Sequence, residues 1–95
     1  MKTFKDLEFT EMVNNYGVNG KRARMMFDNG YGVSVIRTSF SYGGKMGQYE
    51  LAVLDTSENI TYNTPVTNDV LGHLSEKEVT RYMIEVQKLL TFNLK

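Results

Sequence analysis

Apolar residues near the C-terminal end of the chain recur at the spacing of an amphipathic helix. Intervals of three and four residues place them on one helical stripe. The stripe consists of Val79, Tyr82, Met83, Val86, Leu89 and Leu90. Ser75 precedes it and Glu78 stands three residues after Ser75, which is the spacing of a capping box. The sequence therefore predicts a C-terminal helix that begins after Ser75 and packs its stripe against another part of the chain.

Alternating apolar and polar residues predict a β-hairpin formed by residues 21–27 and 31–38. A three-residue loop with Gly30 in the left-handed region would pair Met25 with Val33 and gather apolar side chains on one face. A two-residue turn would instead pair Met26 with Val33 and Arg22 with Arg37, and so would mix apolar and like-charged residues on one face. Because burial of one face selects the register, we expect the three-residue loop.

The remaining patterns are shorter. A strand is expected at residues 48–54, with Tyr49, Leu51 and Val53 facing inward. A short strand is expected at residues 60–62, and residues 3–9 are a weaker strand candidate. Residues 10–20 are expected to form a loop, and residues 67–71 one helical turn. The predicted fold class is α+β: an antiparallel meander of four to five strands with one C-terminal helix packed on one face.

One helix covers only one face of such a sheet, so the other face is expected to be free for water or for a partner. The residues expected on that face are Arg22, Arg24, Met26, Ile36, Ala52 and Leu54.

Length and composition limit the function classes. The 95 residues make a single domain, because two separate cores would each be too small to fold unaided. Eleven basic residues balance eleven acidic ones, whereas a general nucleic-acid binder usually carries a basic excess. The charge is uneven, with a net +3 over residues 1–48 and −3 over residues 49–95. No apolar run approaches the roughly 20 residues that span a bilayer, and the opening MKTFKDLEF is no signal peptide. We expect a cytoplasmic protein that does not contact a membrane.

The sequence contains no catalytic or metal-binding pattern that we can identify. The absence of cysteine excludes thiolate zinc sites and cysteine nucleophiles, and a single histidine argues against a histidine metal cage. His73 has Asp69 four residues away but no nucleophile elbow nearby. Asp69, Glu76 and Glu78 lack the alternating spacing of a calcium loop. We therefore expect no enzymatic activity, no catalytic residues, no metal and no cofactor.

Two segments could contact a partner. Residues 41–47 are rich in glycine and include Lys45, but they do not have the spacing of a phosphate-binding P-loop. They form either a flexible hairpin connection or a contact through Tyr42 and Lys45. The second segment is the basic cluster formed by Lys21, Arg22 and Arg24, with Arg37 across the hairpin. It is interpreted as a solvated sheet face, as a contact for an acidic protein surface, or as a weak nucleic-acid-binding site. The candidate partner-binding residues are Arg22, Arg24, Ile36, Arg37, Tyr42 and Lys45.

Three segments, residues 27–37, 49–54 and 60–70, together with the opening MKTFKDLEF, resemble a group of small uncharacterised proteins encoded by bacteriophages and prophages. The resemblance covers somewhat less than half of the chain and carries no catalytic signature. It implies a bacterial host cell and a compact accessory protein. Small phage proteins of this kind often act by binding, and inhibitors of host defence such as anti-CRISPR proteins are prominent among them.

The leading hypothesis is a non-catalytic binding protein of phage type that docks on a host protein, such as a CRISPR or other defence effector, and inhibits it. One alternative is a homo-oligomer, for example a dimer, that binds a nucleotide or another small ligand. Self-association would then bury the open sheet face. Another alternative is a weak nucleic-acid-binding module that uses the basic cluster.

Overall fold

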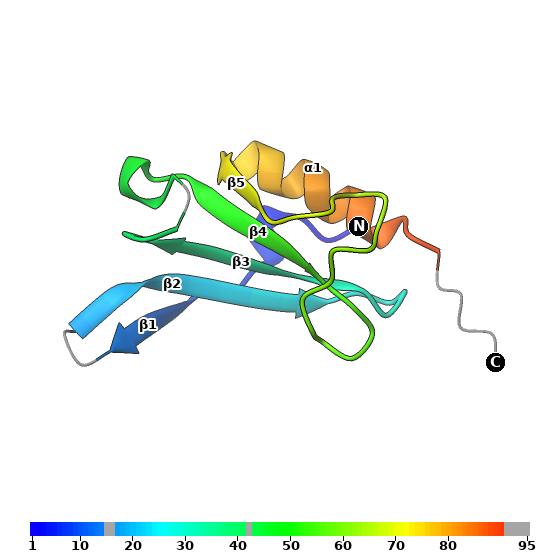
Figure 1. Cartoon of the computed structure of the whole chain (residues 1–95), viewed down its shortest axis with the longest axis horizontal. Helices are drawn as coiled ribbons and strands as arrows, with labels where there is room; N and C mark the ends of the chain where they lie inside the picture. Colours follow the sequence, from blue (N-terminus) through cyan, green and yellow to red (C-terminus); the bar gives the residue numbers. More distant parts are fainter. Residues whose placement is uncertain (15–16, 42, 91–95) are drawn as a thin grey trace.

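The computed structural model describes residues 1–14, 17–41 and 43–90. It is an α+β fold in which one helix packs on a five-stranded antiparallel sheet with the strand order β1-β2-β3-β4-β5 (Figure 1). The strands are β1 (Thr10–Asn14), β2 (Gly17–Met26), β3 (Gly32–Thr38), β4 (Tyr49–Leu54) and β5 (Leu71–Leu74), and the helix α1 is Glu76–Gln87. The predicted fold class is therefore confirmed, and the number of strands is five.

The turn between β2 and β3 has the predicted register. Met25 lies opposite Val33 in the ladder. The amide of Phe27 donates to the carbonyl of Tyr31 at 2.7 Å, and Gly30 has a φ of 91°. This left-handed value is one that glycine adopts without steric cost. The three-residue loop is confirmed, so apolar residues of β2 and β3 share one face.

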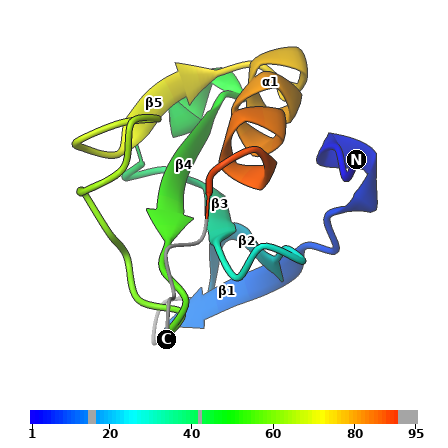
Figure 2. The ribbon, with the colours of Figure 1, turned by 90° about the vertical axis from the view of Figure 1, so that its right-hand side faces the viewer.

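The core lies between that face and α1, which Figure 2 shows on one side of the twisted sheet. We call this side the inner face and the opposite side the outer face. Alternate residues of each strand point inward because successive side chains of a strand point to opposite faces. The fully buried members of the core are Val33, Val35, Leu51, Val53, Val79, Met83 and Val86. The inward orientation of Tyr49, Leu51 and Val53 is confirmed.

The N-terminal quarter of the chain differs from its prediction. Residues 10–20 were expected to form a loop, which is wrong, because β1 pairs with the first half of β2. This hairpin has a register shift between Met12 and Val13, and a side chain at Gly20 (φ 144°) would collide with the backbone of β3. The bulge and the glycine interrupt the alternation that announces a strand.

Residues 3–9 were expected to form a strand, which is also wrong. The structure has a 3₁₀ helix at Phe4–Asp6 instead. Thr3 is its N-cap, and the backbone amide of Thr3 donates to Asp6 Oδ2 at 2.8 Å. The amide of Phe4 donates to Thr80 Oγ1 of α1 at 3.0 Å. This contact with a distant helix fixes the segment on the inner face, and local sequence does not reveal it.

The segment between β4 and α1 holds the last strand. The helical turn expected at residues 67–71 is wrong, since Leu71 lies opposite Leu51 in β5 and Leu74 lies opposite Tyr49. The strand expected at residues 60–62 is reduced to one bridge between Leu54 and Ile60. The edge of β4 has backbone amides and carbonyls that need hydrogen-bond partners. Pairing with these groups, rather than local propensity, determines the structure of the segment that follows β4.

Candidate functional site

The outer face of β2 and β3 carries two of the predicted partner-binding residues side by side. Arg22 and Arg24 are both exposed, and they point to the same face because they are two residues apart in β2. Ile36 lies directly opposite Arg22 in the ladder and is half-buried. Ser34 lies opposite Arg24. The arrangement places one apolar side chain, that of Ile36, beside two arginine side chains.

The outer face is not open along its whole width, which corrects the expectation for β4. Leu54 is fully buried and Ala52 is only 7% exposed. Gly32 lies opposite Leu54, and a Cβ at Gly32 would collide with the sulfur of Met26. The side chain of Met26 therefore extends across Gly32 toward Leu54. Figure 2 shows the connection that follows β4 on the far side of β4 from α1. The outer face of β4 is therefore closed at Ala52 and Leu54, whereas Glu50, opposite Ile36, is half-buried and Thr10 of β1, opposite Arg22, is exposed.

Arg37 does not join Arg22 and Arg24, although the sequence groups them. It follows Val33 and Val35 at intervals of two residues, so it points to the inner face. There it lies opposite Lys21 in the ladder. Its Nη1 donates to the hydroxyl of Tyr49 at 3.4 Å, and its guanidinium carbon lies 5.3 Å from the centre of the Tyr49 ring. The predicted basic cluster is thus divided between two faces.

Three aromatic rings pack together beside Arg37 and Lys21. The ring centres of Phe4, Phe9 and Tyr49 lie 5.1 to 5.7 Å from one another. Lys21 Nζ lies 4.8 Å from the centre of the Phe9 ring and 5.6 Å from that of Tyr49, distances at which an ammonium is attracted to a ring face. The sequence reading missed this role of Lys21, and the only available signal was the predicted register, which already placed Lys21 opposite Arg37.

The glycine-rich connection is a packed structural turn. Gly43 and Gly47 have φ values of 84° and 77° and border a 3₁₀ helix at Gly44–Met46. A side chain at Gly44 would collide with the carbonyl oxygen of Thr38. The glycines are therefore explained by backbone geometry. Lys45 is exposed on this turn, whereas Tyr42 lies outside the described residues.

His73 and Glu78, two of the residues considered for catalysis or metal binding, have structural contacts. His73 is exposed, and its Nδ1 lies 3.3 Å from Gln48 Oε1. Glu78 accepts a hydrogen bond from the amide of Ser75 at 2.9 Å. This bond and the one from the Ser75 side chain hold the pKa of the Glu78 carboxyl below its usual value. In the described part of the chain, no group of three or more histidines and acidic residues is arranged to hold a metal ion.

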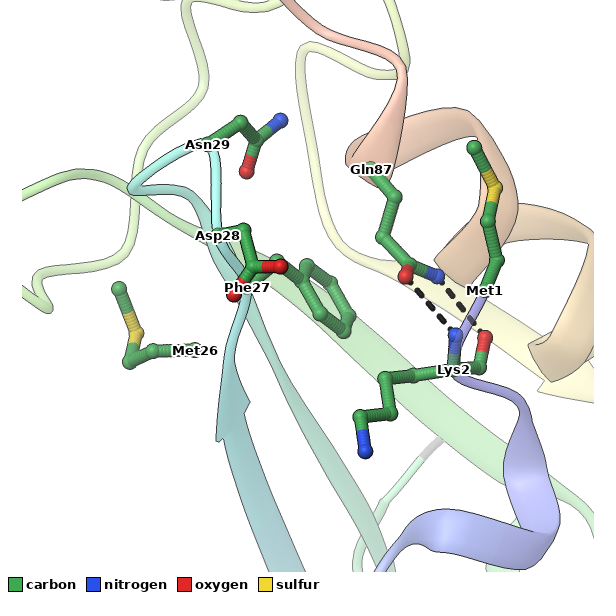
Figure 3. A pocket seen from close by; sticks show the side chains of 7 residues that line it. All are labelled: Met1, Lys2, Met26, Phe27, Asp28, Asn29 and Gln87. Atoms are coloured by element: carbon green, nitrogen blue, oxygen red, sulfur yellow. Dashed lines mark hydrogen bonds between the residues drawn. The ribbon is translucent and has the colours of Figure 1, made fainter.

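A small cavity lies where the N-terminal segment, the β2–β3 turn and the end of α1 meet (Figure 3). Its volume is about 360 Å³. One wall is closed by a reciprocal pair of hydrogen bonds, in which the amide of Lys2 donates to Gln87 Oε1 at 2.9 Å and Gln87 Nε2 donates to the carbonyl of Lys2 at 2.8 Å. Phe27 and Asp28 line the cavity from the turn. None of the predicted partner-binding residues that the structure describes lines it.

Comparison with known proteins gives no relative from which a function could be inferred: no protein-family model, curated protein or solved structure matches the chain. Among the described residues, no helix has both the length and the apolar character that crossing a bilayer requires. The function is therefore argued from the basic side chains of β2 and β3.

Proposed function

We propose that this chain is a non-catalytic binding protein that docks on an acidic surface of another protein through the outer face of β2 and β3. The observation that supports this most directly is the pair of exposed guanidinium groups, Arg22 and Arg24, beside the half-buried Ile36. Arginine next to apolar side chains is enriched at protein interfaces, where it combines a large contact area with directed hydrogen bonds.

The charge of this face also restricts the kind of surface that it fits. Two positive charges are attracted to carboxylates, and complementary charge raises the rate of association. A groove that binds nucleic acid is usually basic itself, so it would repel Arg22 and Arg24. We therefore favour an acidic region of the partner over its nucleic-acid groove.

The resemblance to phage-encoded proteins supplies the biological setting of the proposal. In that setting the partner is a protein of the bacterial host, such as a CRISPR effector or another defence nuclease, and docking inhibits it in the cytoplasm. Inhibition by docking needs no chemical step from this chain.

The test compares two variants with the same change in charge. Arg22→Glu together with Arg24→Glu reverses the outer face, whereas Lys5→Glu together with Lys77→Glu makes the same change on other exposed positions. We expect the wild type and the Lys5/Lys77 variant to retain one stoichiometric partner from host lysates and to block the activity of that partner. The Arg22/Arg24 variant should lose both while remaining folded.

Failure to retain any stoichiometric partner across several hosts would contradict the proposal, and so would equal binding by both variants. The CRISPR assignment has a separate test. It is wrong if the purified protein leaves interference by the common CRISPR types unchanged.

A weak nucleic-acid-binding module is the second candidate, because the same two arginines would attract phosphates. Binding of oligonucleotides that weakens with salt and disappears in the Arg22/Arg24 variant would favour this candidate. Light scattering addresses the third possibility, a homo-oligomer that binds a small ligand, since a monomer at micromolar concentration excludes it.

A further inference from the structure

The inner face carries a pair of positive charges that the proposed docking on the outer face does not use. Lys21 and Arg37 lie directly opposite each other in the β2–β3 ladder, and both are half-buried. Residues in this relation have Cβ atoms about 4.5–5.5 Å apart, and like charges in this position repel each other. The fold therefore holds the Cβ atoms of these two cationic residues close together on the inner face.

Among the described residues, neither of these cations forms an ion pair within 4 Å. The described residues do contain an ion pair at this distance, but it joins Arg81 and Glu85 on α1. Glu11 lies opposite Lys21 in β1, but the Lys21 ammonium lies over the ring of Phe9 instead. An aromatic face attracts a cation and offers no oxygen to accept its hydrogen bonds.

The two cations are also held in place by their surroundings. Lys21 Nζ lies near both Phe9 and Tyr49, whose rings are 5.7 Å apart. Arg37 uses one of its five N–H donors for the Tyr49 hydroxyl, and its side chain has no further hydrogen bond to the part of the chain that the structure describes. Side chains fixed by packing lose little freedom when a ligand binds.

We propose that Lys21 and Arg37 together bind one phosphate group of a small ligand on the inner face. A phosphate monoester carries a charge of about −1.5 to −2 and three acceptor oxygens, so it neutralises both cations. A carboxylate carries one negative charge and would leave one cation unbalanced. This inference is independent of the proposed docking function, because it concerns the opposite face of the same strands.

The experiment is a titration of the whole chain with inorganic phosphate, followed by NMR at constant ionic strength with chloride as the reference ion. We expect saturable shifts centred on Lys21, Arg37 and Tyr49. Lys21→Gln together with Arg37→Gln should weaken binding by about tenfold or more, because hydrogen bonds to charged groups are lost. The control is Arg22→Gln together with Arg24→Gln, which removes the same charge from the other face and should bind phosphate as the wild type does.

Equal weakening in the two double variants would overturn the proposal, because it would indicate general attraction to net charge. Acetate that binds as tightly as phosphate would overturn the assignment to a dianion. Glu11→Gln removes the negative charge next to Lys21 and is expected to tighten phosphate binding. If the inner-face double variant does not fold, the single changes Lys21→Gln and Arg37→Gln are measured, and each should weaken binding.

Adenosine monophosphate then replaces inorganic phosphate to distinguish two sources of the same group. Tighter binding than that of phosphate supports a phosphorylated metabolite, and equal binding supports the free ion. Loss of phosphate binding in the Lys21/Arg37 variant with retained protein docking would support this inference apart from the proposed function.

Discussion

The two ends of α1 are stabilised in different ways. At the N-terminal end, Ser75 and Glu78 satisfy each other's backbone amides, with Glu78 N donating to Ser75 Oγ at 3.1 Å and Ser75 N donating to Glu78 Oε1 at 2.9 Å. At the C-terminal end, Asn29 reaches over from the β2–β3 turn. Its Nδ2 donates to the carbonyls of Val86 and Leu89 at 2.9 and 3.0 Å.

Both ends solve the same problem, since the terminal amides and carbonyls of a helix have no partners within it. The capping interaction at the N-terminal end joins residues three positions apart, so the sequence alone predicts it. The solution at the C-terminal end spans about sixty residues. It also joins the helix to the turn that sets the register of the sheet, because Asn29 Oδ1 accepts from the amide of Tyr31 at 3.1 Å. We therefore expect the distant cap to contribute more to stability.

The largest expected effect is that of Asn29→Ala. This change removes the hydrogen bonds to the carbonyls of Val86 in α1 and of Leu89 just after it, and one within the turn. It should lower the free energy of unfolding by about 2 kcal/mol. The corresponding fall in Tm is about 10 °C for a domain of this size. Urea unfolding measures the effect, with Asn68→Ala at an exposed position as the control.

A second change at the same position separates the two roles of Asn29. Asn29→Asp keeps the oxygen that accepts from Tyr31, but it replaces the amide donor with a carboxylate oxygen at the negative end of the helix dipole. It should destabilise the protein at least as much as alanine at neutral pH. Stability close to that of the wild type would mean that the helix cap contributes little.

A smaller effect is expected for Ser75→Ala, which removes the local cap. Loss of an N-cap hydroxyl typically costs about 1 kcal/mol, so the fall in Tm should be about 5 °C. Ser57→Ala in an exposed turn is the matched control. If Ser75→Ala destabilises the protein more than Asn29→Ala, the order of the two helix ends is the reverse of the one argued above.

The smallest effect is a pH dependence at the N-terminal end. The amide and side chain of Ser75 hold the pKa of Glu78 below its ordinary value of 4.5, so the folded state favours the ionised carboxylate. The resulting stabilisation is present above pH 4.5 and is lost as the pH falls through the lowered pKa. Urea midpoints across this range should show the wild type and Glu78→Gln converging at low pH. A difference that stays constant with pH would contradict the assignment.

Much of the fold could be predicted wherever one face of an element is buried. The β2–β3 register followed from keeping Met25 and Val33 on the same face, and the helix followed from its apolar stripe and cap. The strand β5 could not be predicted in this way, since it has only four residues and His73 within it has a φ of 57°. Its conformation depends on pairing with β4.

For the candidate partner-binding residues, the structure shows where each described side chain lies, and this differs from the sequence-based grouping. The exposed positions of Arg22 and Arg24 agree with the expectation. Arg37 was grouped with them by charge, although the alternation already placed it on the other face. The stacking of Lys21 on Phe9 could not be foreseen, because it depends on an N-terminal segment in which Phe9 packs on Phe4 and Phe4 is bound to α1.

The sequence by itself determined the elements whose interactions are local: the capped helix, the three-residue turn and the alternation that gives β2, β3 and β4 an inner face. The tertiary structure decided which distant groups form hydrogen bonds with backbone groups that have no local partner. Examples are the pairing of β5 with β4, the pairing of β1 with β2, and the hydrogen bonds of Asn29 to carbonyls at the end of α1. It also divided the basic residues between two faces. The physical reason is that a buried amide or carbonyl must be hydrogen-bonded, and in a chain of this size the available partner is often far away in the sequence.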